Sequence, residues 1–188
     1  MEGNDDTALV ARLRQGDTAA FEEVYERLRP AVFGYLVRMC GRRDLAEDLL
    51  QDTFVRLAER APDLAEGTRL LCWLFTVARN LFVSQYRRHR TWCELARAED
   101  PWFAPREGRS PLAAAADGAT ARALERALMR LPPQAREAIV LTAGEMLRPR
   151  EAAEVLGISA EAFRQRLSRA RAQLDAELGK TGEGREER

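Results

Sequence analysis

The chain has 188 residues, of which 46% are hydrophobic and 32% charged, and its 30 basic and 30 acidic residues give a net charge of zero. This composition excludes a wholly disordered chain, and the neutral total argues against a protein that coats nucleic acid over its whole surface. No apolar run approaches the roughly 20 residues of a membrane span, and the start is acidic rather than signal-like, so we expect a cytoplasmic protein without a membrane span.

Cysteine and histidine are too scattered for a disulfide framework or a paired zinc motif. Cys40, Cys72 and Cys93 lie far apart, and the chain has one histidine, His89. No further ligand lies near the pair His89 and Cys93, so we expect no metal and no other cofactor. With no glycine-rich phosphate loop either, we expect no enzymatic activity. Oxidant sensing by a cysteine stays open, with a structural role favoured.

Apolar residues recur at three- and four-residue intervals along almost the whole chain, which predicts an all-α fold. A short first helix ends near Gly16, and a second runs from about Asp17 to Gly41. A third helix opens at Asp44-Leu-Ala-Glu47, a sequence typical of a capping box, and runs to about Arg60. The polar face of this third helix is expected to carry Glu47, Asp48, Gln51, Asp52 and Arg56.

The next helix, from about Thr68 to Arg90, changes character along its length. Its first half is apolar and aromatic, and we assign Trp73 and Phe75 to the core because they fall inside the apolar stripe. Its second half is basic, since the stretch from Arg79 to Arg97 holds five arginines and one glutamate, a net charge of +4.

Residues 98–118 are rich in Pro, Gly and Ala, which is typical of an interdomain linker. The sequence therefore predicts two small helical domains, over residues 1–97 and 119–178. Trp102 and Phe103 are unusual in a tether. Docking on a partner or on one of the domains would explain them, and so would a local hydrophobic anchor.

The second domain is expected to begin with helices over Ala119–Arg130 and from Pro132 to Gly144. Two further helices follow and complete a four-helix domain. The charged, glycine-rich residues 179–188 are predicted to form a disordered tail.

Those last two helices have the spacing of a helix-turn-helix. Ala153 is small enough to let two helices approach, and Gly157 suits the turn between them. Phe163 would fill the angle between the helices. Ser159 can cap the second helix, and Glu161 in its first turn suits the helix dipole.

Positive charge is concentrated on this motif. Six arginines and three glutamates between Arg148 and Arg171 give a net charge of +3, against zero for the whole chain. An arginine-rich helix is often only a solvated surface helix, but the preceding turn favours a helix that enters a DNA groove.

The order and spacing of five segments, over about residues 6–178, resemble one family: the extracytoplasmic-function (ECF) sigma factors of bacterial RNA polymerase. The segments are FEEVYERLRPAVFGYLVRMCG, DLAEDLLQDTFVRLAER, WLFTVARNL with its basic run, LERALMRLPPQAREAIVL and the helix-turn-helix. The resemblance implies a dissociable specificity subunit that binds core polymerase and directs promoter recognition and transcription initiation. It also implies promoter DNA, core RNA polymerase and an anti-sigma factor as partners.

The resemblance assigns three groups of site residues. Those that would bind the clamp of the polymerase large subunit are Asp48, Gln51, Asp52 and Arg56. Those that would capture the minus-ten element are Pro62, Asp63, Leu64, Gly67, Thr68, Arg79, Asn80, Tyr86, Arg87, Arg88 and Arg90. Those that would bind the minus-thirty-five element are Arg148, Arg150, Ser159, Glu161, Arg164, Gln165, Arg166, Arg169 and Arg171.

One departure from the family pattern falls inside the helix-turn-helix. Members of the family commonly carry a small or β-branched run where this chain has Glu161-Ala162-Phe163, so DNA binding is better supported than the identity of any base read there. Two alternatives stay open. A conventional helix-turn-helix regulator would leave the acidic and the aromatic-basic helices without a role, and a sigma-like antagonist would keep polymerase binding while losing DNA contacts.

Overall fold

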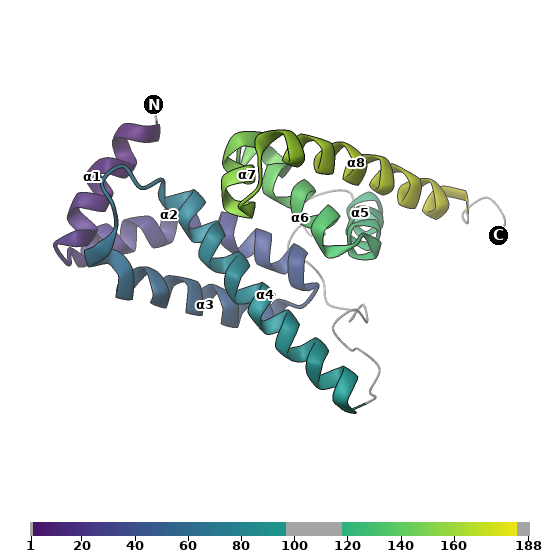
Figure 1. Cartoon of the computed structure of the whole chain (residues 1–188), viewed down its shortest axis with the longest axis horizontal. Coiled ribbons are helices and arrows are strands. Elements are labelled where there is room, and N and C mark those ends of the chain that lie inside the picture. The colour runs from purple at the N-terminus through teal and green to yellow at the C-terminus, as the bar shows by residue number, and fades with distance from the viewer. Residues whose placement is uncertain (1, 97–117, 184–188) are drawn as a thin grey trace.

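The computed structural model describes residues 2–96 and 118–183 (Figure 1). Every regular element in these ranges is a helix, which confirms the predicted all-α class. The amino-terminal part contains α1 (Glu2–Arg14), α2 (Thr18–Cys40), α3 (Arg43–Arg60), the short 3-10 helix η1 (Ala61–Asp63) and α4 (Leu70–Ala96). The carboxy-terminal part contains α5 (Gly118–Arg130), α6 (Pro133–Thr142), the 3-10 helix η3 (Ala143–Glu145), α7 (Pro149–Leu156) and α8 (Ala160–Glu183).

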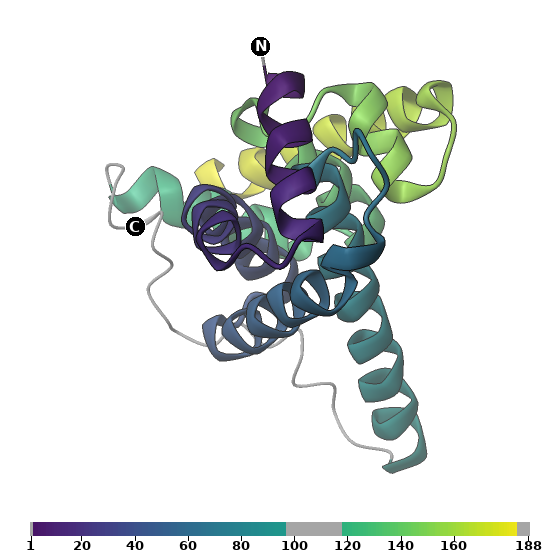
Figure 2. The same cartoon turned by 90° about the vertical axis from the view of Figure 1, so that its left-hand side faces the viewer.

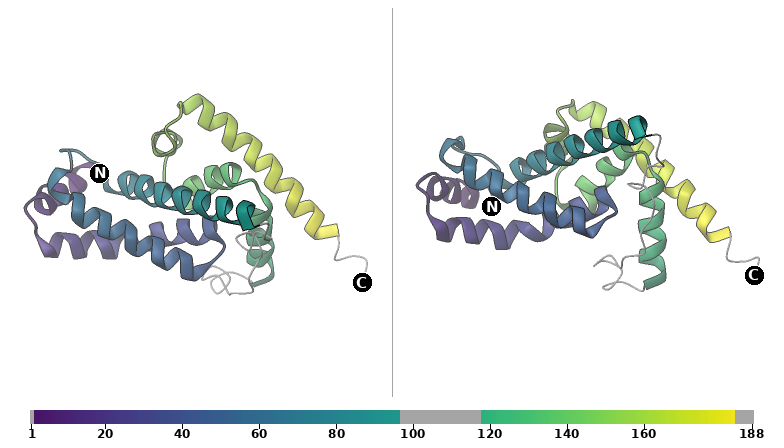
Figure 3. Two further views of the ribbon diagram at one scale, coloured as in Figure 1. Left: turned by 60° about the horizontal axis from the view of Figure 1, so that its bottom comes forward. Right: turned by 90° about the horizontal axis from the view of Figure 1, so that it is seen from below.

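Trp102 and Phe103 of the predicted linker lie outside the described residues. The helix α8 continues to Glu183, into the segment expected to be a disordered tail, and its far end extends past the other helices (Figure 3).

Local signals at both ends of α2 explain its length. The Asp17 carboxylate caps the helix by accepting hydrogen bonds from the backbone N–H groups of Ala19 and Ala20, at 2.9 and 3.2 Å. At the other end Gly41 adopts a left-handed backbone with φ of 66°, and its N–H donates to the Val37 carbonyl at 2.8 Å. This left-handed residue ends the helix and turns the chain into α3.

The predicted capping box at the start of α3 is wrong. The helix begins at Arg43, so Asp44 lies inside the first turn rather than before it. Its carboxylate accepts a hydrogen bond from the guanidinium of Arg42 at 3.2 Å, and this contact is the main cause that lowers the pKa of Asp44 to about 2. Glu47 pairs instead with Arg43, at 2.8 Å. Two arginines thus take up the carboxylates that a capping box would have used.

The core of the amino-terminal part forms where α2, α3 and α4 pack together. Tyr35, Leu57 and Phe75 are fully buried there. The rings of Tyr35 and Phe75 meet edge to face at 5.3 Å. Burying an aromatic or leucine side chain of this kind stabilises a fold by roughly 1.5–3 kcal/mol, so these contacts fix the frame that carries the rest.

The carboxy-terminal part is organised around a buried arginine. The Arg136 guanidinium donates hydrogen bonds to the carbonyls of Leu128, Met129 and Leu131 at the end of α5, at 3.0, 2.9 and 3.2 Å. A further bond, at 2.9 Å, reaches the carbonyl of Met39 in α2. Burial lowers the pKa of Arg136 to about 10, which still leaves the side chain charged at neutral pH.

The two parts pack directly on each other, with α6 against α2 and α7 against α4 (Figures 1 and 2). At the first contact the buried Glu137 accepts a hydrogen bond from the Tyr35 hydroxyl at 3.0 Å and forms an ion pair with Arg79, also at 3.0 Å. At the second contact Arg69 forms ion pairs with Glu151, at 2.7 Å, and with Glu154. The carboxyl-terminal half of α4 extends beyond the other helices (Figures 1 and 2).

Candidate nucleic-acid interface

The predicted helix-turn-helix is formed by α7 and α8. Gly157 lies between them with φ of 65°, and its N–H donates to carbonyls at the end of α7. Phe163 is fully buried in the angle between the helices, as the sequence predicts. The Ser159 hydroxyl accepts a hydrogen bond from the N–H of Ala162 at 3.1 Å, which confirms Ser159 as the cap of α8.

Most basic residues of α8 face away from this packing, whereas Arg166 is half-buried and lies close enough to Glu137 of α6 to lower the pKa of that carboxyl. Phe163, Leu167 and Ala170 form the buried side of the helix. The exposed or half-exposed side carries Arg164, Gln165, Arg166, Arg169 and Arg171. This division leaves a cationic surface along the helix that follows the turn, which is the arrangement needed to reach a DNA groove.

Glu161, in the first turn of α8, binds the next two polar side chains of the helix. Glu161 accepts hydrogen bonds from Arg164 at 2.6 Å and from Gln165 at 3.3 Å. The bond from Arg164 is the main cause that lowers the pKa of Glu161. A contact with DNA through Arg164 or Gln165 would therefore compete with Glu161.

The start of α7 presents two more exposed arginines, Arg148 and Arg150. The backbone N–H of Arg148 donates to the Glu151 carboxylate at 2.7 Å, and Pro149 occupies the first helical position. Since Glu151 also pairs with Arg69, the same carboxylate fixes the beginning of α7 and ties it to the residue before α4.

The loop between α3 and α4 contains five of the residues assigned to the minus-ten element, and the structure divides them by exposure. Pro62, Asp63 and Gly67 are exposed, and Gly67 has a φ of 75°. The Thr68 hydroxyl donates to the Ala65 carbonyl at 2.7 Å. Leu64 is buried in the core, so it holds the loop in place rather than offering its side chain to a base.

The α4 residues assigned to the same element also separate into groups. Asn80, Arg87 and Arg88 are exposed, and Arg88 donates to the side chain of Gln85 at 3.1 Å. The Tyr86 ring is half-buried and stacks on Phe82 with the ring centres 6.2 Å apart. Arg90 lies in α4, and its side chain is outside the described set.

Arg79 differs from the other arginines of α4 because it points into the contact between the two parts. It pairs with the buried Glu137 of α6, and only about a quarter of its side chain, 26%, is exposed. The family resemblance groups Arg79 with the residues that would capture the minus-ten element. Its partner Glu137 lies far along the chain, so the local sequence gives no sign of this ion pair.

The four residues assigned to polymerase binding lie together on one exposed face of α3. Asp48, Gln51, Asp52 and Arg56 are all exposed. Arg56 pairs with Glu59 at 2.8 Å, an exposed contact that adds little stability. The face is free of packing within the described residues, so it is available to a partner.

A groove of about 510 Å³ beside this face is a feature that sequence reasoning missed. It runs between α2 and α3 and is lined by Phe21, Tyr25, Arg29, Phe33, Arg43, Glu47, Leu50, Gln51, Phe54, Val55 and Ala58. The rings of Tyr25 and Phe54 meet edge to face at 4.7 Å on its wall. The signal available in the sequence was Val55, an apolar residue between polar ones on the outward face, which is 47% exposed.

The geometry defines a class of protein: a helical DNA-binding protein with a helix-turn-helix on one part and a second basic helix on the other. Two family models match it, sigma-70 region 2 over residues 24–91 and sigma-70 region 4 over residues 121–174. These two matches confirm the prediction of two domains. No helix among the described residues is long and apolar enough to cross a membrane.

Relatives and solved structures agree with these matches. The chain is 36% identical to the RNA polymerase sigma factor CarQ of Myxococcus xanthus, over 89% of this chain and 94% of the relative. It is 31% identical to the ECF sigma factor EcfG of Rhodopseudomonas palustris, over 79% of this chain and 80% of the relative. The structure of CnrH in complex with the cytosolic domain of CnrY is similar with a TM-score of 0.70 and 29% identity, over 93% of this chain and 97% of that one.

The chain therefore belongs to the sigma-70 family of RNA polymerase sigma factors, in its extracytoplasmic-function group. It is an alternative sigma factor, which binds core polymerase and directs promoter recognition and transcription initiation. The sigma factor RpoE of Bartonella quintana, solved in complex with the anti-sigma factor NepR, is also similar, with a TM-score of 0.68 and 27% identity over 85% of this chain and 96% of that one.

Proposed function

We propose that three surfaces of this sigma factor divide promoter recognition between them. The exposed face of α3 binds the clamp of the polymerase large subunit. The loop before α4 and the basic half of α4 capture the minus-ten element, and the start of α8 binds the minus-thirty-five element. The observation that carries the proposal is that the cationic side of α8 and the polar face of α3 are both exposed while their apolar sides are buried.

The polymerase contact is proposed for Asp48, Gln51, Asp52 and Arg56. Aspartate is a poor residue for a helix interior, so two of them on one exposed face have no local benefit to the helix. Their negative charge would instead contribute to binding if the partner surface is basic. Val55 and the groove beside it add apolar area to the same face, and apolar area at the centre of a polar surface is typical of a binding site.

The minus-ten contact is proposed for the exposed part of the loop and for the basic end of α4. Strand opening needs a positive track for the backbone and a surface on which a base can stack. Arg87, Arg88 and Arg90 supply the track, and Tyr86 supplies a ring next to it. Arg79 joins this track only after its ion pair with Glu137 opens, which requires the two parts of the protein to separate on the promoter.

The minus-thirty-five contact is proposed for the first turns of α8 and for the start of α7. Arg164, Gln165 and Arg166 would meet base edges or phosphates, and Arg169 and Arg171 would bind the backbone further along. Arg148 and Arg150 would add phosphate contacts from α7. Ser159 and Glu161 would shape the start of α8, and Glu161 could instead accept from a cytosine amino group.

Two further proposals concern the setting of the protein. We infer that an anti-sigma factor holds it inactive, since two similar sigma factors were solved with the cytosolic domain of CnrY and with NepR. We also infer a cytoplasmic location, because its binding partners, RNA polymerase and promoter DNA, are found there. The domain boundaries proposed from the sequence are residues 1–97 and 119–178.

In vitro transcription tests the whole scheme. The purified protein and sigma-free bacterial core polymerase would transcribe a fragmented genomic library, and the start sites would be sequenced. New starts that share two upstream motifs are expected. The double variant Asp48→Ala and Asp52→Ala should abolish them and lose core binding, while the matched double variant Glu22→Ala and Glu26→Ala on the exposed face of α2 should keep both.

A second pair of variants separates the two DNA contacts. Arg169→Ala should weaken binding to duplex DNA that carries the minus-thirty-five motif. It should also make the dependence of the logarithm of the binding constant on the logarithm of the salt concentration less steep, by the amount expected for about one lost phosphate contact. Arg126→Ala, an exposed arginine on α5, is the matched control and should leave both quantities unchanged. Core binding without any new start site would instead support the antagonist alternative.

A further inference from the structure

The start of α4 is held by a carboxylate from the first helix of the chain. The Asp6 side chain accepts a hydrogen bond from the backbone N–H of Leu70, the first residue of α4, at 3.0 Å. Its other oxygen accepts from the guanidinium of Arg27 in α2 at 2.6 Å, and only 18% of the Asp6 side chain is exposed. Asp6 thus joins α1, α2 and the beginning of α4 at one point.

This contact supplies a cap that the local sequence does not. The first N–H groups of a helix have no partner within the helix, and a negative charge close to them is favourable. Thr68, two residues before α4, is the residue type that normally caps a helix, but its hydroxyl donates to the Ala65 carbonyl at 2.7 Å. The acceptor for the N–H of Leu70 is thus the Asp6 carboxylate, which comes from another helix.

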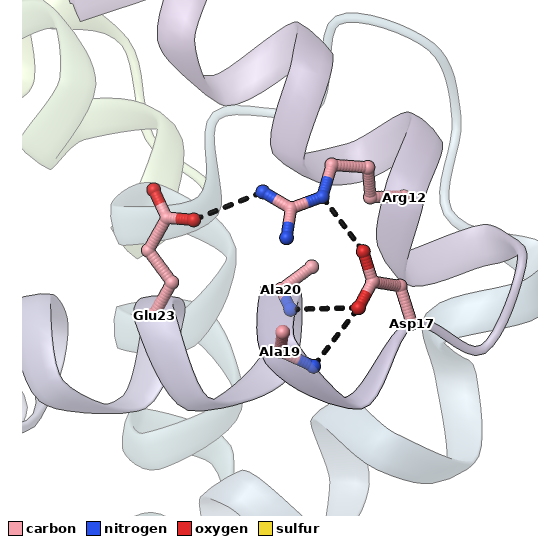
Figure 4. Close-up of polar contacts among 5 residues, drawn as sticks. All are labelled: Arg12, Asp17, Ala19, Ala20 and Glu23. Atoms are coloured by element: carbon pink, nitrogen blue, oxygen red, sulfur yellow. Dashed lines mark hydrogen bonds and ion pairs between the residues drawn. The ribbon is translucent and has the colours of Figure 1, made fainter.

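The helix that carries Asp6 is itself firmly held. Arg12 bridges the end of α1 to the start of α2, with 2.7 Å to Asp17 and 3.0 Å to Glu23 (Figure 4). Asp17 at the same time caps α2 through Ala19 and Ala20. The apolar side of α1, formed by Leu9, Val10 and Leu13, is buried. Asp6 is thus presented from a fixed support.

The candidate base-capturing loop, residues 65–67, is held at both ends by packed or hydrogen-bonded residues. Leu64 holds one end because its side chain is buried in the core. Asp6 holds the other end at Leu70. The exposed residues between them, 65–67, have their positions set by these two ends and by the left-handed backbone of Gly67. The family model for region 2 begins at residue 24, so Asp6 lies outside the matched segment.

We propose that Asp6 is a positioning residue for minus-ten recognition. It contacts no DNA itself. It fixes where α4 begins and so sets the shape of the loop that receives an unpaired base. The inference rests on the proposed function of that loop, and it predicts that loss of Asp6 weakens single-strand capture more than any other activity of the protein.

The test uses full-length protein assembled with core polymerase. Three quantities would be measured by fluorescence anisotropy for the wild type, Asp6→Ala, Asp6→Asn and the control Glu23→Ala: core affinity, affinity for a single-stranded minus-ten oligonucleotide from a promoter found by transcription, and affinity for duplex with the minus-thirty-five motif. Losing a helix cap typically destabilises the capped end by enough to reduce single-strand affinity about fivefold to tenfold in Asp6→Ala.

The expected pattern is selective. Asp6→Ala should lose single-strand affinity while core and duplex affinities stay within about twofold of wild type. Asp6→Asn keeps an oxygen that can accept from Leu70 and should recover most of the loss, and Glu23→Ala, which contacts Arg12 on the same support, should match the wild type. Unpaired thymines detected by permanganate on the full promoter should fall in the same order.

Two results would overturn the inference. Single-strand affinity equal to wild type in Asp6→Ala would show that the loop does not need the cap, and an equal fall in all three affinities would show a purely structural role. If Asp6→Ala does not fold, Asp6→Leu, which has a similar shape but no oxygen to accept from Leu70, takes its place in the same comparison with Glu23→Ala. A wild-type holoenzyme that starts transcription but does not bind the single strand would instead contradict the proposed function of the loop.

Discussion

The ion pair between Arg79 and Glu137 joins the two parts of the protein through a carboxylate that is almost completely buried. Burial raises the pKa of Glu137 more than Arg79, the Tyr35 hydroxyl and Arg166 together lower it. The folded protein therefore favours the protonated form of Glu137 relative to the unfolded chain. The pair specifies how the two parts dock, because the burial of its carboxylate offsets the attraction between the two charges.

The first prediction follows from the direction of this shift. Because the folded-state pKa of Glu137 is raised, the stability that this group contributes is present below pH 4.5, its ordinary value, and is lost as the pH rises through the folded value. Glu137→Gln should therefore be as stable as wild type at pH 7, and the free energy of unfolding of wild type relative to this variant should fall as the pH rises. Urea unfolding of both proteins from pH 4 to pH 7 measures the difference.

The partner variant gives the opposite result at neutral pH. Arg79→Gln leaves a buried carboxylate without its cation and should lower the free energy of unfolding by about 2–4 kcal/mol at pH 7. Glu59→Gln, which removes one member of the exposed pair with Arg56, should change it by less than about 0.5 kcal/mol. Equal losses in Glu137→Gln and Arg79→Gln would contradict this account.

Arg136 is predicted to be the most sensitive polar residue of the carboxy-terminal part. Arg136→Ala leaves the carbonyls of Leu128, Leu131 and Met39 without this donor in a buried site, so it should lower the free energy of unfolding by about 3 kcal/mol or more. Arg136→Lys keeps the charge but cannot reproduce the planar set of donors, so it should recover only a small part of the loss. Urea titration monitored by circular dichroism provides both values, and full recovery by lysine would count against the hydrogen-bond explanation.

A close approach at Gly41 predicts a measurable coupling between the two parts. A Cβ at Gly41 would clash with the terminal methyl carbon of Met129, and the φ of 66° at Gly41 already disfavours any other residue. Gly16→Ala has a similar φ, 76°, but open space around it, so it reports the backbone strain alone at about 1 kcal/mol.

Gly41→Ala should therefore be slightly more destabilising than Gly16→Ala, because the Met129 methyl is the end of a flexible side chain that can turn aside at a small cost. The excess should shrink when Met129→Ala is added, because that change removes the atoms in the way. A double-mutant cycle by urea unfolding measures this coupling. Its absence would mean that Met129 moves aside without a loss of stability.

Cysteine reactivity provides a prediction with a pH dependence. Burial raises the pKa of the Cys40 thiol to about 12 and that of Cys72 to about 11, so at pH 8 both are almost entirely thiols rather than thiolates. In a Cys93→Ser background, iodoacetamide should label native protein slowly at pH 8, faster at Cys72 as the pH rises, and fast at both sites in urea. Mass spectrometry of the two peptides follows the reaction, and rapid labelling of native Cys40 at pH 8 would contradict the burial argument.

The sequence predicted most where the physical signal is local. The helix-turn-helix was found because Gly157, Ser159 and Phe163 each serve their role within a few residues of one another. The capping box at Asp44 was wrong because the pattern is equally local, and the competing partner Arg42 lies just outside it. The class of fold followed from helical periodicity, which packing reinforces rather than overrides.

The sequence predicted least where a residue's role depends on a distant partner. Nothing in the local sequence distinguishes Arg79 from Arg87, but Arg79 forms an ion pair with Glu137 of α6 in the contact between the two parts. Leu64 was grouped with its exposed neighbours although its side chain is buried. The caps and pairs made by Asp6 and Arg69 join elements that are far apart along the chain, so no spacing rule reveals them.

The ion pairs of Arg69 would link binding at the proposed minus-ten site to binding at the proposed minus-thirty-five site. It directly precedes α4 and follows the candidate minus-ten loop, while its partners Glu151 and Glu154 belong to the first helix of the helix-turn-helix. A movement of the helix-turn-helix that breaks these pairs would also release a residue at the border of the loop. Binding at one proposed site would then alter the affinity of the other, by the same factor in both directions. Since Arg69 is 41% exposed, that mutual effect should stay below about fivefold, small enough for each element to be bound on its own.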